Sequence, residues 1–273
     1  MKTISKWAIL ALLPIVVLSS CKKDSPDPIP PVNPWDDMVL VHDTTIQGEN
    51  LQIRVFSDRE LYVGYNNLYF LVTDAAGKEV IQPTAISFSP MMEMSTMNHA
   101  CPNGQPSWNQ ELSMFHGYSV FQMASGMMGS WFLDLTVTLE GVEYQYTISP
   151  AVAAPSEARL FSFTDAISNN IYIVALIEPM NPKIGINDFI VGFYKKESMM
   201  SFPPVAGMGI EITPEMPTMG HGSPNNVNPV YTADGQYEGK VNFTMSGYWK
   251  VNMVIKDSEF VVIKDNAYFD ITF

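Results

Sequence analysis

The sequence predicts an all-β protein made of two tandem immunoglobulin-like antiparallel β-sandwich domains. Three observations support this prediction. Short segments alternate apolar and polar residues, as half-buried strands do. No stretch longer than about ten residues beyond residue 21 has the periodicity of a helix. The chain also contains two copies of one unit, each of about 110 to 120 residues, which is an ordinary size for one domain.

Short predicted strands at this spacing are typical of a sandwich. The alternation is clearest in FLDLTVTL (132–139) and in YWKVNMVI (248–255). Turn residues in DAAGKE and TADGQYEG separate neighbouring strands. The predicted strands are 51–56, 68–74, 84–90, 132–139 and 142–149 in the first copy, and 159–165, 171–179, 189–195, 240–246, 248–256, 259–264 and 267–273 in the second.

The repeat is found by placing MMEMSTMNHACP (91–102) over TPEMPTMGHGSP (213–224). Upstream, VGYNNLYFLV (63–72) resembles IGINDFIVGF (184–193). We therefore predict a first domain over 38–152 and a second over 155–273, joined near PSEA (155–158). The matched pairs are Glu93 with Glu215, Met94 with Met216, Thr96 with Thr218, Met97 with Met219, His99 with His221, Pro102 with Pro224, Gly117 with Gly239, Phe121 with Phe243, Met123 with Met245 and Trp131 with Trp249.

Residues 1–20 are predicted to be a lipoprotein signal peptide. Lys2 and Lys6 precede a short apolar run over 7–17, and the run ends in Leu-Ser-Ser-Cys. This ending resembles a lipobox, which implies that Cys21 is lipidated and anchors the protein to a membrane. The alternative is ordinary secretion with an unmodified cysteine.

Residues 21–37 are predicted to be a Pro-rich tether, because KKDSPDPIPPVNPW cannot bury a core and favours extended geometry. We expect an outer-membrane lipoprotein on the periplasmic or the cell-surface face. The start Lys22-Lys23-Asp24 resembles an export tag of surface lipoproteins.

Charge excludes some partners. Without residues 1–20 the chain has 13 basic and 28 acidic residues, a net charge of −15. Nucleic acid and anionic lipid both require a basic face, so neither is an expected partner. Beyond Cys21 only Cys101 remains, so no intrachain disulfide between folded parts is expected.

The segment PEMPTMGHG (214–222) carries Met216, Met219 and His221 between prolines and glycines. Thioether and imidazole are suitable ligands for Cu(I), and a thioether stays a ligand in an oxidising compartment. The repeat predicts a second such set, Met94, Met97 and His99. The alternative is that the methionines fill the core and each histidine bonds the backbone.

Other donors are weaker candidates. Met123 and Met245 lie on strand-like segments and are additional candidate ligands, although core packing is the simpler interpretation. Cys101 is another candidate, but Ser223 replaces it in the second copy. The remaining methionines are interpreted as packing or edge residues: Met91, Met92, Met127, Met128, Met199, Met200 and Met208.

At these residues the chain resembles the YtkA-like family, which is related to the FixH group. PEMPTMGHG followed by YEGKVNFTMSGYWKVNMVI is similar to the family's Met-Pro-x-Met-x-His loop, strand and Gly-Trp pair, and KIGIND is similar to its upstream segment. The first copy departs from this pattern at Ser95, at Asn98 and in GMMGSWF. The resemblance implies an immunoglobulin-like sandwich with a role in copper export or cuproenzyme assembly, with a copper exporter or respiratory oxidase assembly components as partners.

Two other functions compete with copper binding. Tandem sandwiches on a surface lipoprotein could bind glycan or protein, with Trp108 in GQPSWNQ as a stacking platform and the Met loops structural. An enzyme is not expected, because no nucleophile elbow, zinc-protease helix or phosphate loop is present. A blue-copper site assembled from His99, Cys101, His116 and a methionine would exist only in the first copy.

Overall fold

The structure is a computed structural model, which describes residues 33–46 and 48–273. The predicted signal peptide, the predicted lipidation site Cys21 and most of the predicted tether lie outside the described residues. Contacts between Cα atoms group Pro34–Phe273 into one compact unit. In the described part of the chain, no helix has the length and apolar character needed to cross a membrane.

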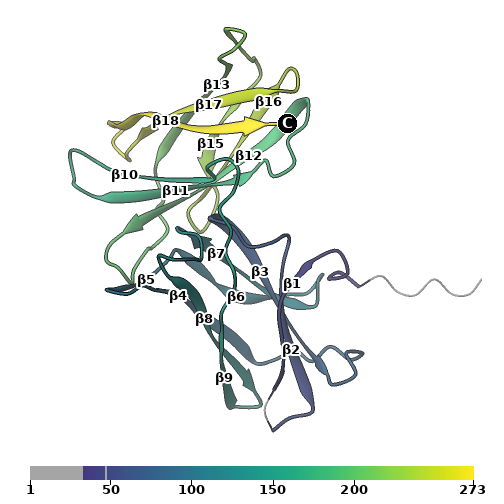
Figure 1. Ribbon diagram of the computed structural model, residues 1–273. Helices are drawn as coiled ribbons and strands as arrows, with labels where there is room; N and C mark the ends of the chain where they lie inside the picture. Colours follow the sequence, from purple (N-terminus) through teal and green to yellow (C-terminus); the bar gives the residue numbers. More distant parts are fainter. Residues whose placement is uncertain (1–32, 47) are drawn as a thin grey trace, which may run out of the picture. The chain divides into compact units, whose positions relative to one another are not determined.

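The first half of the compact unit forms two antiparallel sheets (Figure 1). One has the order β1-β2-β3-β7-β6 and the other β5-β4-β8-β9. The strands are β1 (Val39–Ile46), β2 (Leu51–Ser57), β3 (Gly64–Asp74), β4 (Ala85–Glu93), β5 (Asn98–Ala100), β6 (Asn103–Asn109), β7 (Met114–Phe121), β8 (Ser130–Leu139) and β9 (Val142–Ile148).

The second half repeats this arrangement strand for strand. Its sheets have the orders β10-β11-β12-β16-β15 and β14-β13-β17-β18. The strands are β10 (Leu160–Thr164), β11 (Ile171–Glu178), β12 (Gly185–Lys196), β13 (Gly209–Met216), β14 (His221–Gly222), β15 (Val227–Tyr231), β16 (Gln236–Phe243), β17 (Tyr248–Lys256) and β18 (Val262–Thr272). The all-β, immunoglobulin-like sandwich class predicted from the sequence is therefore confirmed.

Each half has its own apolar core between its two sheets. Alternate residues of β8 and of β17 point inward, which explains the alternation seen in the sequence. Trp131 is fully buried in the first core and Trp249 in the second. Both tryptophans lie near the start of their strands, at the end of the sandwich where the Met–His segments lie.

A buried asparagine explains the repeated motif before β3 and β12. The Asn66 side chain accepts a hydrogen bond from the N–H of Tyr62 at 3.0 Å and donates to the carbonyl oxygens of Tyr62 and Gly64. Asn187 makes the same three bonds with Lys183 and Gly185. The motif is thus a turn closed by one side chain, which satisfies backbone groups at the start of the strand.

The repeated glycines Gly117 and Gly239 mark a close backbone approach. A Cβ atom at Gly117 would lie 2.6 Å from the carbonyl oxygen of Gly104, and one at Gly239 would lie 2.4 Å from that of Val227. Both partners lie on strands whose pairing shifts register, at Gly104/Ser107 and Val227/Val230. Only glycine lets these strands meet at this distance.

Three sequence predictions about elements are wrong. The segments 259–264 and 267–273 were predicted as two strands, but Val262–Thr272 forms the single strand β18. Its pairing with β17 has register shifts near Ile255, which accommodate the interruption. Met123 and Met245 lie beyond the ends of β7 and β16, in the bends that lead to β8 and β17, and not on strands. Several further strands were not predicted from the sequence, including β1, β7 and β13.

The two sandwiches are packed against each other within the compact unit. A cluster of buried residues joins β3 and β7 to β11 and β12 and includes Tyr65, Tyr118 and Tyr194. The Tyr65 and Tyr118 rings stack at a centroid distance of 4.8 Å. The N–H of Ala100 donates to the carbonyl oxygen of Met199 at 2.8 Å, so β5 of the first sandwich is bonded to a loop of the second.

Candidate metal site

The Met–His segment of the second sandwich is a β-hairpin and not an irregular loop. Met216 is the last residue of β13, His221 is the first residue of β14, and the two are register partners. Residues 217–220 form the turn, in which the N–H groups of Met219 and Gly220 both donate to the carbonyl oxygen of Met216. The hairpin therefore places one methionine directly across from the histidine.

The first sandwich has the same hairpin with a longer turn. Here His99 is the register partner of Met92, and Met92 also pairs with Trp131 on β8. Six residues separate Met92 from His99, whereas four separate Met216 from His221. The first hairpin is therefore two residues longer.

This geometry corrects the sequence alignment. Met92 and Met216 are both buried, and both lie across from the histidine of their hairpin. The structural counterpart of Met216 is thus Met92, which the sequence analysis had assigned to packing. Met94, its predicted counterpart, lies in the turn as an extra residue. A gapless alignment could not detect the insertion, although the shared Pro-x-Met of residues 90–92 and 214–216 indicates it.

Each histidine ring lies edge-on to the buried tryptophan of its sandwich. The His99 and Trp131 rings have centroids 5.5 Å apart with an interplanar angle of 90°. The His221 and Trp249 rings are 5.9 Å apart at 79°. The indole N–H groups donate to the carbonyl oxygens of Met123 and Met245, at 2.8 and 3.0 Å. The backbone of these two methionines therefore fixes the tryptophans against which the histidines rest.

The hydrogen bonding of both histidines leaves one ring nitrogen available. His99 Nδ1 lies 2.9 Å from the carbonyl oxygen of Ala100, and His221 Nδ1 lies 3.0 Å from that of Gly222. A carbonyl oxygen only accepts, so Nδ1 carries a proton, and in the neutral ring Nε2 then carries the lone pair. Among the described residues neither Nε2 atom has a hydrogen-bond partner. This is the tautomer and orientation that metal-binding histidines adopt.

The methionines of each hairpin occupy two environments. The terminal methyl of Met216 lies close to Gly247: a Cβ atom built on this glycine would be only 2.8 Å from the methyl carbon. The terminal methyl of Met92 lies close to Gly129, with a corresponding distance of 3.1 Å. In contrast, Met219 is 59% exposed and Met97 is 51% exposed. Each hairpin thus has one methionine held in the core beside the histidine and one exposed methionine in the turn, and the first hairpin also has the partly buried Met94 in its turn.

The remaining predicted ligands are less suited to a metal. Met123 and Met245 are half-buried and pack against the cores. Cys101 is 1% exposed, and burial raises the pKa of its thiol far above the ordinary value. Because the thiolate is the form that binds metal, this environment opposes the predicted role of Cys101. It also opposes the blue-copper alternative.

Two further findings limit other functions. The described residues contain no group of three or more His, Cys, Asp or Glu side chains that could hold a metal ion. Trp108 lies within β6 and packs against Phe115 at a ring distance of 5.4 Å. The prediction that Trp108 lies in a loop is therefore wrong, because it belongs to β6, and its half-buried ring contacts the core.

Fold and hairpins together define a β-sandwich protein whose Met–His hairpin occurs in both sandwiches. The YtkA-like family model matches residues 168–254, which run from before β11 to near the end of β17. This match covers the second hairpin and confirms the family resemblance predicted for the second copy. No curated protein matches the sequence.

Several solved structures are similar to parts of the chain at low TM-scores. The FdeC adhesin of Escherichia coli is 11% identical, with 84% of this chain and 66% of that chain covered and a TM-score of 0.25. InvD of Yersinia pseudotuberculosis is 14% identical, with 87% and 57% covered and a TM-score of 0.25. A DUF4785 family protein of Legionella pneumophila is 7% identical, with 80% and 56% covered and a TM-score of 0.27. This chain thus spans less than two thirds of the length of those chains.

Proposed function

We propose that this protein binds Cu(I) at the Met–His hairpins and takes part in copper handling. The observation that supports the proposal best is the repeated histidine geometry. In both sandwiches Nδ1 is bonded to a backbone carbonyl, Nε2 has no partner among the described residues, and a buried methionine lies directly across the hairpin.

The donor types favour Cu(I) over other ions. Thioether sulfur and imidazole nitrogen are soft or borderline donors, whereas Mg²⁺ and Ca²⁺ require oxygen ligands. In the second sandwich the set is Met216, Met219 and His221. In the first sandwich it is Met92, Met97 and His99, with Met94 as a further thioether in the longer turn. The turn methionine is exposed, and its thioether would complete the coordination of an ion held by the other two.

The test is a titration of Cu(I) into residues 34–273 against a chromogenic chelator, under anaerobic and reducing conditions. This unit contains both cores and all the described strands. We expect two equivalents to be taken up. Met216→Leu/His221→Ala should remove one equivalent and Met92→Leu/His99→Ala the other, because leucine keeps the volume of methionine without its sulfur.

Met208→Leu is a matched control, since Met208 packs beside the second core away from the hairpin. Far-ultraviolet circular dichroism should show that each variant remains folded. Uptake that is unchanged in both double variants, or no uptake by the wild-type protein, would contradict the proposal. The methionines would then serve only in packing.

We further propose that the protein acts outside the cytoplasm as a binding protein and not as an enzyme, anchored through a lipid on Cys21. In this position it would exchange Cu(I) with a copper exporter or with components that assemble a respiratory oxidase. Cys21→Ser should release the protein from the membrane fraction and abolish labelling by a fatty acid. Membrane retention of the variant would argue against the anchor.

A further inference from the structure

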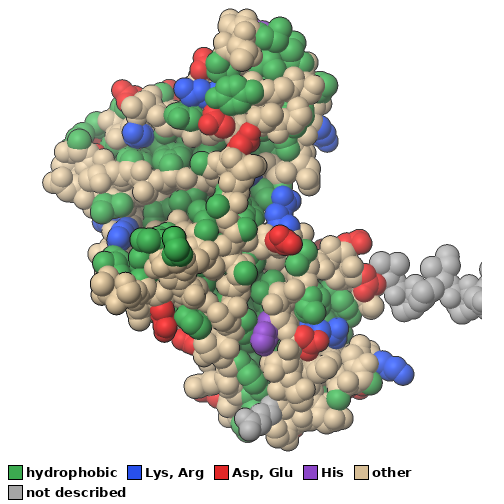
Figure 2. All heavy atoms as spheres, in the orientation of Figure 1, with side chains coloured by type: hydrophobic (Ala, Val, Ile, Leu, Met, Phe, Trp, Pro, Cys, Tyr) green, Lys and Arg blue, Asp and Glu red, His purple; other side chains and the backbone are tan. Residues whose placement is uncertain are grey.

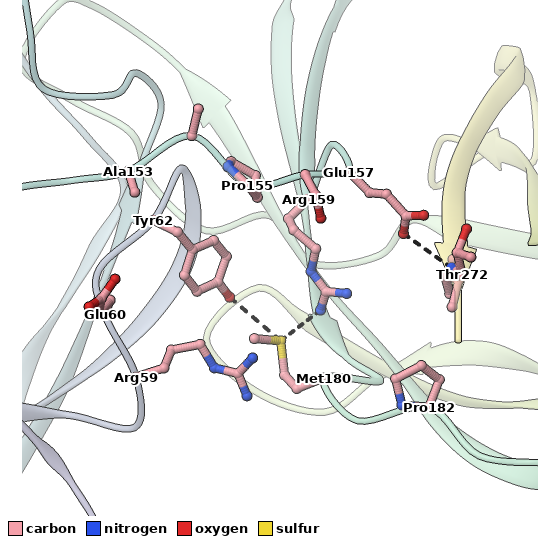
Figure 3. A pocket seen from close by; sticks show the side chains of 13 residues that line it. Arg59, Glu60, Tyr62, Ala153, Pro155, Glu157, Arg159, Met180, Pro182 and Thr272 are labelled. Carbon is pink, nitrogen blue, oxygen red and sulfur yellow. Dashed lines mark hydrogen bonds between the residues drawn. The ribbon is translucent and has the colours of Figure 1, made fainter.

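A pocket of 510 Å³ lies at the junction of the two sandwiches, far in sequence from the metal hairpins. Its lining includes Arg59 and Tyr62, which precede β3, and Arg159 and Met180, which flank β10 and β11 (Figure 3). The connector between β9 and β10 forms another wall. The chain has three arginines, and two of them line this pocket, although acidic residues outnumber basic ones.

The two arginines have different roles. Arg159 donates to the carbonyl oxygens of Leu176, Ile177 and Pro179 and to the sulfur of Met180. The Arg159 side chain therefore holds the C-terminal end of β11 in place. The side chain of Arg59 lies on the other side of Met180 (Figure 3). No hydrogen bond or ion pair joins Arg59 to another described residue.

Acidic and basic side chains are interspersed on the face that Figure 2 shows, and glutamates also lie at this pocket. Glu157 accepts a hydrogen bond from the N–H of Thr272 at 3.2 Å, and Glu178 accepts one from the N–H of Met180 at 2.7 Å. Glu60 lines the pocket but is exposed. Burial lowers the pKa of Arg159 and the nearby charge of Arg59 lowers it further, whereas Tyr62 and Glu178 oppose this shift. Two guanidinium groups thus repel each other beside an open pocket.

We propose that this pocket binds a carboxylate attached to an apolar body, and that the Arg59 guanidinium makes the direct contact. A guanidinium fork matches a planar carboxylate in a bidentate pair, which is among the stronger polar interactions in proteins. Pro155, Met180, Pro182 and Ile271 provide an apolar wall next to the arginine. The charge of Arg159 adds attraction. Its Nη groups already donate to backbone carbonyl oxygens and to Met180, whereas its buried Nε has no hydrogen-bond partner among the described residues.

Two sources of this chemistry fit the pocket equally: a small organic acid and the C-terminal carboxylate of a peptide. The probes are hippurate for the first and the tripeptide Gly-Gly-Phe for the second, each measured by calorimetry against residues 34–273. The corresponding amides, hippuramide and Gly-Gly-Phe amide, are the neutral controls. We expect at least one carboxylate to bind below about 10 mM and its amide to bind at least about tenfold more weakly.

Arg59→Gln should weaken binding of that carboxylate at least about tenfold. Arg59→Lys should bind it more tightly than Arg59→Gln but more weakly than the wild-type protein. Arg54→Gln is the matched control, since Arg54 lies on β2 and bonds Thr73. The proposal is overturned if neither carboxylate binds below about 10 mM, if the amides bind equally well, or if Arg59→Gln binds like Arg54→Gln. Cu(I) uptake of all these variants should be unchanged, which separates this site from the hairpins.

Discussion

The two Met–His hairpins share one design but give the histidine different surroundings. His99 is 6% exposed, and the next residue, Ala100, is bonded to a loop of the other sandwich. His221 is half-buried, and its strand β14 has only two residues and an exposed glycine. The same hairpin therefore has a less accessible histidine in the copy that is bonded to the neighbouring sandwich.

This difference has a consequence for copper handling under the proposed function. An ion in the first hairpin must leave past a buried ring and a strand bonded on both sides. An ion in the second hairpin can leave when a short, open turn moves. We therefore expect the first site to hold copper longer and the second to exchange it faster.

The largest expected effect concerns the tryptophan behind each histidine. Trp249→Ala and Trp131→Ala should each lower the free energy of unfolding by about 3 to 5 kcal/mol, because each deletes a fully buried ring. Urea unfolding measures this cost. Similar values in the two sandwiches would show that the cores are equivalent despite their different hairpins.

Trp108→Ala is the control for these variants, since Trp108 is only half-buried on β6. Its cost should be smaller, roughly 1 to 2 kcal/mol. A cost below about 1 kcal/mol for either core tryptophan would show that its sandwich is not packed as described.

The next effect tests which methionine of the first hairpin corresponds to Met216. Met92→Leu should weaken Cu(I) binding at the first site by roughly tenfold or more, as Met216→Leu should at the second, because each removes a thioether across from the histidine. Met94→Leu should have a clearly smaller effect. Chelator competition with each single variant measures which substitution weakens binding more. A larger effect of Met94→Leu than of Met92→Leu would support the gapless alignment, in which Met94 corresponds to Met216.

The exchange rates of the two sites should differ by about tenfold or more, since access governs dissociation. Transfer of Cu(I) from the loaded protein to excess chelator should show a fast and a slow phase. His221→Ala should remove the fast phase and His99→Ala the slow one. A single phase in the wild-type protein would contradict the comparison.

The smallest expected effect is a pH dependence confined to the first sandwich. Its β7 carries His116 where β16 carries the exposed Glu238. Burial lowers the pKa of His116 from 6.5, although the nearby Asp58 charge opposes this shift. The folded state then binds the proton more weakly than the unfolded state. Stability is therefore lost as the pH falls below 6.5 toward the folded pKa.

Amide hydrogen exchange across this pH range measures the effect. Amides of β3 and β7 should lose protection as the pH falls, once rates are corrected for intrinsic exchange, and those of β12 and β16 should not. In His116→Gln, the amides of β3 and β7 should no longer respond. An equal loss of protection in both sandwiches would show that another group causes it.

Sequence reasoning succeeded where the signal is local or repeated. Alternation predicted strands such as β8 and β17 because a sheet with one buried face imposes a period of two. The repeat pointed to the equivalence of His99 and His221. The sequence alignment wrongly paired Met94, and not Met92, with Met216, because a two-residue insertion in a turn leaves the composition of the segment nearly unchanged. Sequence reasoning also failed at Trp108, whose polar neighbours concealed a strand at the edge of a sheet.

The sequence by itself determined the fold class, the resemblance to the YtkA-like family and the residue types of the hairpins, since these depend on periodicity and on motifs close together in the chain. Only the tertiary structure decided which methionine faces each histidine, that Nδ1 is bonded and Nε2 free, and that Arg59 and Arg159 share a pocket. The first two features depend on strand register, because a shift of one residue changes which side chains face each other. The third depends on packing between residues 100 positions apart in the chain, which no local pattern encodes.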